Sequence, residues 1–115
     1  MELSKKEKRE LRVLVGECYE VHLSDLLENL YEDFQKWGGK YIDTFELTDR
    51  IHEFHDKKAR ELYGMYVLSP PEVAIIYALR NKIIGKDGID KNLFNKLNIN
   101  QDIAERFEEN EGENA

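Results

Sequence analysis

Apolar residues recur at spacings of three and four along the first third of the chain, a pattern typical of one side of an amphipathic helix. The pattern predicts a helix over residues 4–37. Ser4 and Glu7 have the spacing of a capping box at its start, and Gly38 and Gly39, which are suited to positive φ, predict its end. The stripe consists of Leu11, Leu14, Val15, Cys18, His22, Leu26, Leu30, Phe34 and Trp37.

A second helix is predicted from Asp43 or Thr44, either of which suits an N-cap, to about Tyr66. A third helix is predicted to begin at Ser69, which precedes two prolines that the first helical turn tolerates. The residues that follow are apolar nearly all round and continue to Ile84, so this third helix is expected to be buried. The inner side of the second helix is predicted to contain Leu47, Ile51, Phe54, His55, Lys58 and Leu62, with the Lys58 side chain reaching outward along its stem.

The remainder of the chain predicts two short helices and a tail. Asp90 caps the first, Asn98 or Asn100 begins the second, and residues 108–115 form an acidic flexible tail. The expected fold is therefore all-α, a long antiparallel two-helix hairpin with a buried third helix and two short C-terminal helices, in one domain over residues 1–107. The apolar residues of the two short helices are Leu93, Phe94, Leu97, Ile103 and Phe107.

The length of the first helix has a consequence for assembly. At about 1.5 Å per residue it would be roughly 50 Å long, whereas a globule of this size has a radius of gyration of about 13 Å. The helix must either break near Gly16 or project beyond the rest of the fold. A projecting apolar stripe needs cover, and a second copy of the chain would supply it. We therefore expect a homodimer built on the helical hairpin.

Charge and cysteine content limit the classes of partner. The chain has 24 acidic and 17 basic residues, a net charge of −7, which disfavours a sequence-independent grip on nucleic acid. The single cysteine excludes an intramolecular disulfide and favours a reducing compartment. The charged N-terminal residues do not resemble a secretory signal, and no segment has the length of a membrane span. The sequence thus predicts a cytoplasmic protein without nucleic-acid or membrane partners.

The three histidines are the first candidates for chemistry. His52 and His55 are three residues apart, Asp49 lies three before His52, and His22 lies on the first helix. Imidazole and carboxylate groups at helical spacing suit a transition metal. One hypothesis is therefore a metal site between the first two helices with the ligands His22, Asp49, His52 and His55. The competing interpretation is that these are ordinary surface or boundary pairs, and the first hypothesis requires that the histidines converge on one accessible cleft.

Other catalytic and cofactor motifs are not present in the sequence. Cys18 lies on the inner stripe of the first helix, where a thiol is usually inert packing, although His22 follows one turn later. The glycine turns lack the spacing of a phosphate-binding loop. Ile89 and Lys91 occupy positions where a calcium loop needs oxygen ligands. We predict no cofactor.

Aromatic residues gather near the predicted helix ends. Tyrosine and tryptophan are favoured at protein interfaces because they combine a large apolar body with a polar tip, although they also fill the ends of helical cores. The function predicted from the sequence is a non-enzymatic helical protein-interaction or regulatory module that acts as a homodimer. The alternative is a small helical metal-binding protein or hydrolase that uses His22, His52 and His55 with nearby carboxylates. The predicted partner-binding residues are Tyr31, Phe34, Trp37, Tyr41, Tyr63 and Tyr66.

Overall fold

The computed structural model describes residues 3–97 of the chain. These residues are mostly helical and contain no β-strand, which confirms the all-α prediction. The predicted last helix, with Ile103 and Phe107, and the predicted tail over residues 108–115 lie outside the described residues. No helix within residues 3–97 is long and apolar enough to cross a lipid bilayer.

The first helix, α1, spans Lys5–Gly38 without a break, so Gly16 lies inside a continuous helix. The predicted capping box is formed: Ser4 Oγ accepts a hydrogen bond from the Glu7 amide, and the Glu7 carboxylate accepts one from the Ser4 amide, at 3.1 and 3.0 Å. The left-handed residue after the helix is Lys40, with φ 65°, and neither Gly38 nor Gly39 has positive φ. The helix therefore ends where predicted, but the turn is made by a lysine.

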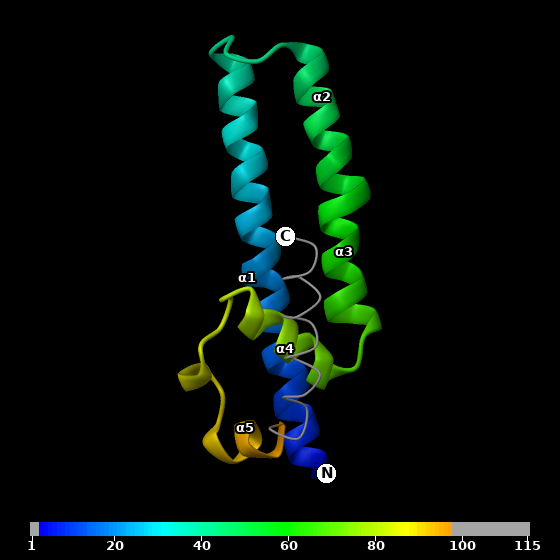
Figure 1. Cartoon of the computed structure of the whole chain (residues 1–115), viewed down its shortest axis with the longest axis vertical. Coiled ribbons are helices and arrows are strands. Elements are labelled where there is room, and N and C mark those ends of the chain that lie inside the picture. The colour runs from blue at the N-terminus through cyan, green and yellow to red at the C-terminus, as the bar shows by residue number, and fades with distance from the viewer. Residues whose placement is uncertain (1–2, 98–115) are drawn as a thin grey trace, which may run out of the picture.

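The second arm of the hairpin returns along α1 and runs antiparallel to it (Figure 1). It begins at α2, Thr44–Glu53, whose N-cap Asp43 accepts a hydrogen bond from the Glu46 amide at 2.7 Å. The arm continues without interruption through a π-helical segment, η1, a short α-helix, α3, and a second π-helical segment, η2. The bounds of these three elements are Phe54–Ala59, Arg60–Tyr63 and Gly64–Leu68.

The two π-helical segments were not predicted, and the spacing of the buried residues provides a physical reason for them. Leu62 and Tyr66 are four residues apart and both are buried. In an α-helix a step of four residues rotates the side chain by about 40°, so repeated steps of four carry an apolar row away from its partner. A π-helical turn, closed by i→i+5 hydrogen bonds, contains more residues and offsets this rotation. The widened turns thus keep the apolar row directed at α1.

The third long helix, α4, spans Pro71–Arg80 and differs from its prediction at both ends. Its N-cap is Pro70, because the Ser69 hydroxyl instead donates to the Gly64 carbonyl at 3.1 Å. The helix also ends before Ile84, because Lys82 takes a left-handed conformation with φ 58°. Several side chains of this helix belong to the buried set of the described chain. Ala74, Ile75, Ile76 and Ala78 are buried.

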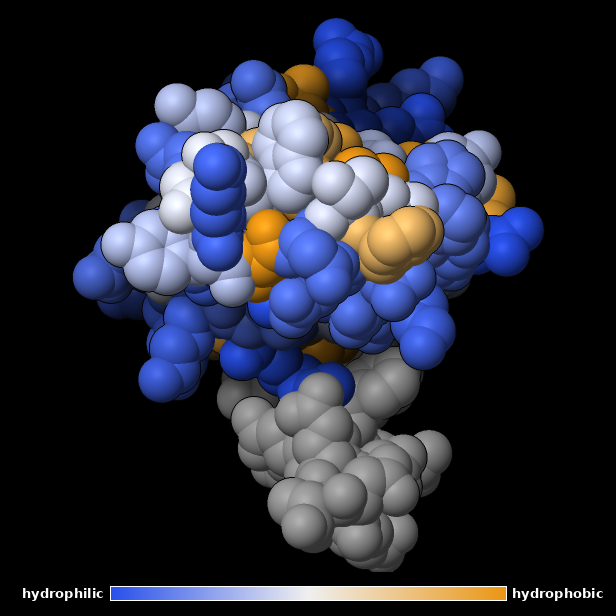
Figure 2. All heavy atoms as spheres, turned by 90° about the horizontal axis from the view of Figure 1, so that it is seen from above, coloured by the Kyte–Doolittle hydropathy of each residue, from blue (hydrophilic) through white to orange (hydrophobic). Residues whose placement is uncertain are grey.

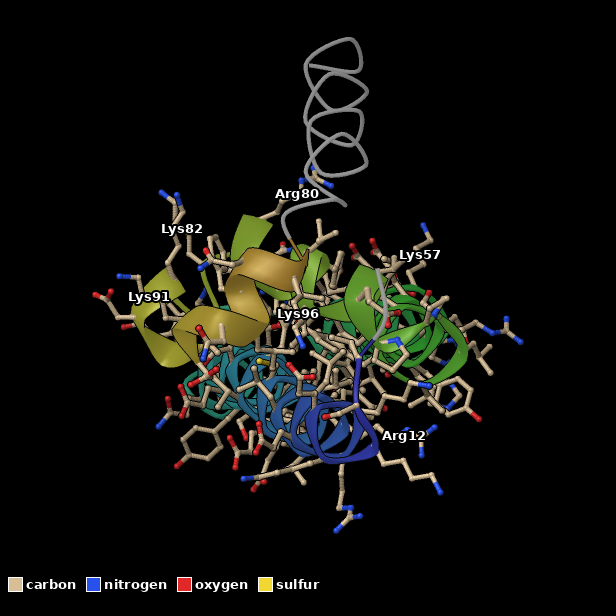
Figure 3. The ribbon with its side chains drawn as sticks, turned by 90° about the horizontal axis from the view of Figure 1, so that it is seen from below. Arg12, Lys57, Arg80, Lys82, Lys91 and Lys96 are labelled. Carbon is tan, nitrogen blue, oxygen red and sulfur yellow. The ribbon has the colours of Figure 1, made fainter. Side chains whose placement is uncertain are left out.

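The last described helix, α5, spans Lys91–Leu97 and follows a single 3₁₀ turn, η3, at Lys86–Gly88. The Asp90 carboxylate accepts a hydrogen bond from the Leu93 amide at 3.2 Å, so the predicted capping residue is used. Lys96 points from α5 toward α1 and forms an ion pair with Glu7 at 2.6 Å (Figure 3). This pair holds α5 against the first turn of α1.

The hydrophobic core lies at one end of the hairpin. It is formed by the N-terminal half of α1, the end of the second arm, α4 and α5, while the two arms continue beyond it to the connecting loop (Figure 1). The molecule is accordingly elongated, with principal extents of 54 × 32 × 24 Å. The buried members of the core are Leu11, Val15, Cys18, Leu62, Tyr66, Ala74, Ile75, Ala78, Ile89, Leu93 and Leu97.

Candidate interaction surface

His22 is part of an aromatic cluster between three elements. Its Nδ1 atom lies 2.9 Å from the hydroxyl of Tyr66, which is only 4% exposed. The His22 ring stacks on Tyr77 of α4, with ring centroids 5.7 Å apart, and Tyr19 stacks on Tyr66 at 5.4 Å. The cluster therefore joins α1, η2 and α4 through one partly buried hydrogen bond and several ring contacts.

Burial sets the protonation states of this cluster. Desolvation lowers the pKa of His22 below its usual value, although Asp25 and Glu61 act in the opposite direction. Desolvation also raises the pKa of the Tyr66 hydroxyl and of the Cys18 thiol. All three groups are thus favoured in their neutral forms, which suits a structural contact and gives Cys18 little thiolate for nucleophilic chemistry.

The predicted metal ligands do not come together. His52 and Asp49 are exposed on α2, and His55 is exposed on η1, where its Nδ1 lies 3.1 Å from Asp56. Within residues 3–97, no three His, Cys, Asp or Glu side chains are arranged to hold a metal ion. The structure therefore does not assemble His22, Asp49, His52 and His55 into a metal site within these residues.

The histidines of the second arm do not face α1 because the two sides of this arm differ in polarity. The side of α2 and η1 that faces α1 is taken by the buried or half-buried apolar side chains of Leu47, Ile51 and Phe54. The polar histidines are consequently turned to solvent, including His55, which the sequence had placed on the inner side. The convergence that the hydrolase hypothesis requires is not found.

At the opposite end of the hairpin, large aromatic side chains are exposed around the loop. Tyr41 and Phe45 are 84% and 82% exposed, and three further aromatic side chains, Tyr31, Phe34 and Trp37, are exposed on the last turns of α1. The view from this end has white to orange side chains over the middle of the face, with blue hydrophilic ones among and around them (Figure 2). We call this the loop-end surface, and its aromatic residues are Tyr31, Phe34, Trp37, Tyr41 and Phe45.

Local contacts fix the aromatic residues on both sides of the loop. The Trp37 indole donates a hydrogen bond to the Thr44 hydroxyl at 3.2 Å, so the last turn of α1 is joined to the first residue of α2. A Cβ atom at Gly39 would lie 3.1 Å from the ring of Tyr41, and the glycine therefore lets this ring lie close to the loop backbone. These contacts position side chains that the core does not reach.

The arms below the loop are held together by charge and by one buried leucine. Arg50 of α2 pairs with Asp33 of α1 at 2.5 Å and with Glu46 at 3.1 Å. Leu47 is buried one turn before Arg50 on the same arm. The loop-end surface is therefore presented on two braced helices.

The exposure of α1 residues near the loop follows from helix geometry. Val15, Tyr19, Leu23, Leu27 and Tyr31 are spaced by four residues. Each step rotates the position by about 40°, so the row moves around the helix as it approaches the loop. Val15 is buried, Tyr19 and Leu23 are half-buried, and Leu27 and Tyr31 are exposed. An apolar row that begins in the core thus ends in solvent.

Two of the predicted partner-binding residues lie elsewhere. Tyr66 lies in the core and has no surface to offer a partner, which corrects its prediction. Tyr63 is partly exposed on α3, below the loop end. Phe45 was not among the predicted partner-binding residues. Its position already indicated exposure, because it does not belong to the apolar row formed by Leu47 and Ile51.

Comparisons with known proteins give no further guide to function. The chain matches no known protein family, no curated protein and no solved structure. The functional argument therefore depends on the surface described above.

Proposed function

We propose that the protein is a non-enzymatic protein-interaction or regulatory module that acts as a homodimer and binds a partner protein through its loop-end surface. The observation that carries this proposal is the group of exposed aromatic side chains on a hairpin end that the core does not cover. Scattered single apolar residues are normal on a protein surface, but a group of large aromatic ones is typical of an interaction site. The long hairpin and its buried third helix would serve as the supporting frame.

The physical chemistry of these residues supports protein recognition. Tyr31, Trp37 and Tyr41 each combine a large apolar ring with a hydrogen-bonding group, and few rotatable bonds are fixed when they bind. Trp37 is already oriented by its hydrogen bond to Thr44. Ordering this surface on binding would therefore cost less conformational entropy than ordering a flexible loop.

The partner hypothesis is tested by affinity capture from the native host at physiological salt, with two matched variants. Trp37→Ser/Tyr41→Ser/Phe45→Ser removes the loop-end surface, and Val67→Ser/Leu68→Ser removes exposed apolar side chains from η2 instead. We expect a near-stoichiometric partner with the wild type and the η2 variant, and its loss with the loop-end variant. Equal capture by all three chains, or capture by none, would contradict the proposal.

The homodimer is tested separately by sedimentation velocity of the purified chain at micromolar concentration. We expect a dimer. A strict monomer would contradict this part of the proposal while leaving the loop-end capture experiment unaffected, because a monomer also presents the loop-end surface.

A further inference from the structure

Gly16 lies inside α1, and no contact among the described residues requires a glycine there. A glycine in a helix interior destabilises the helix by about 1 kcal/mol relative to alanine. It is exposed, and a Cβ atom built on it would have no heavy atom within 4 Å among the residues that the structure describes, outside its own helix backbone and its two chain neighbours. The fold of residues 3–97 would therefore accept a larger residue here. Glycine is useful at such a position when another backbone approaches closely.

The charges of α1 are divided on either side of this glycine. The first turns are rich in basic residues, whereas every charged residue from 13 to 35 is acidic. A second α1 helix laid antiparallel would place the basic turns of each chain on the acidic turns of the other. A parallel arrangement would instead bring like charges together. The first turns contain Lys5, Lys6, Lys8, Arg9 and Arg12 together with Glu7 and Glu10, and the acidic residues beyond Gly16 are Glu17, Glu20, Asp25, Glu28, Glu32 and Asp33, of which Asp33 pairs with Arg50.

The mostly exposed side of α1 that includes Gly16 has the spacing of a helix-pairing seam. The residues on it alternate between steps of four and three, the heptad spacing that keeps a row facing a partner helix. Val13 is 59% and Leu27 is 48% exposed, so the seam offers apolar surface that the described residues do not cover. Arg12, at the margin of the seam, is exposed at the side of α1 (Figure 3). The seam consists of Arg9, Val13, Gly16, Glu20, Leu23 and Leu27.

We propose that two copies of the chain pair antiparallel along this seam of α1 and cross at Gly16. This inference rests on the proposed homodimer and names its interface. The absence of a side chain at Gly16 lets the two backbones approach, Val13 and Leu27 supply apolar contact, and the divided charges select the antiparallel direction. The loop-end surfaces then lie at opposite ends of the pair and stay open to partners.

Gly16→Leu provides the first test, by sedimentation equilibrium and urea unfolding. Leucine blocks the close approach but suits a helix and meets no described atom, so we expect at least a tenfold weaker dimer and a monomer fold that is no less stable. Gly38→Leu is the matched control, since its Cβ also meets open space, at the far end of α1. It should leave the dimer unchanged. Equal dimer affinity of the two variants would overturn the proposed interface.

A charge exchange tests the direction of pairing. Arg9→Glu/Arg12→Glu and Glu17→Lys/Glu20→Lys should each weaken their own homodimers at least tenfold at low salt. Mixed in equal amounts, they should form a heterodimer, because in an antiparallel pair each reversed segment meets an oppositely charged one. Homodimers that resist both reversals, or a mixture that stays monomeric, would overturn the antiparallel seam.

The outcomes also separate this inference from the homodimer on which it rests. A wild-type dimer that survives Gly16→Leu and both charge reversals would leave the homodimer standing and overturn the seam. If Trp37→Ser/Tyr41→Ser/Phe45→Ser dissociated that dimer instead, the loop-end surface would be the interface. A monomeric wild type would overturn both proposals together.

Discussion

The two ends of the hairpin are built from the same helices but differ in what surrounds them. At the core end, α4 and α5 pack on α1 and the second arm, so that side chains such as Leu11 and Ile75 are almost wholly buried. Within residues 3–97, only two helices face each other at the loop end, and Leu47 is the buried apolar residue there. Two helices cannot enclose large side chains from all directions. The aromatic residues at the loop end are therefore not explained by packing, whereas those at the core end are.

Truncation of Ile75 should give the largest effect, because this side chain is fully buried in α4. We expect Ile75→Ala to lower the free energy of unfolding by about 2–5 kcal/mol through lost burial and the cavity left behind. Urea unfolding followed by circular dichroism measures it. A loss below about 1 kcal/mol would mean that the core end does not carry most of the stability.

The His22 cluster should make stability depend on pH. Because burial lowers the pKa of His22 in the folded chain, the unfolded chain binds more protons near and below the usual value of 6.5. Stability should therefore be full above that value and decrease as the pH falls through the lowered pKa. Unfolding curves between pH 5 and pH 8 would measure the slope. We expect His22→Gln to have a shallower slope, and equal slopes would show that His22 does not contribute.

Truncation of Phe45 should give the smallest effect on folding. This ring is mostly exposed, and surface substitutions away from special contacts usually change stability by no more than about 0.5 kcal/mol. We expect Phe45→Ala to unfold at the urea midpoint of the wild type. A loss of unfolding free energy comparable to that of Ile75→Ala would show that the loop end is a second core. The exposed aromatic side chains would then no longer support a binding surface there.

Much of the helical layout could be predicted because it depends on neighbouring residues. The Ser4–Glu7 capping box and the Asp90 cap are local patterns, and both are formed. The early end of α4 was missed because the left-handed residue that ends it is Lys82 and not a glycine, with the Ile83 amide donating to the Ala78 carbonyl at 2.9 Å. The π-helical segments were missed because they depend on the position of α1, which the local sequence does not give.

The sites were harder to predict because they depend on which side of each helix is covered. His22 and Tyr66 are 44 positions apart, and their hydrogen bond exists only because η2 returns to α1. His52 and His55 have a spacing that permits a shared site, yet the apolar side of the same arm takes the inner position. Residue type and spacing can nominate candidates, but only the burial of each side decides between them.

The unbroken course of α1 also sets a distance. From Gly16 to Gly38 the helix rises roughly 33 Å at about 1.5 Å per residue. In an antiparallel pair crossing at Gly16, the two loop ends would stand roughly 66 Å apart on stiff arms. Such a pair would act as a bivalent ruler: a target with two docking sites at that separation would gain effective concentration for the second contact, and one with closer sites would not.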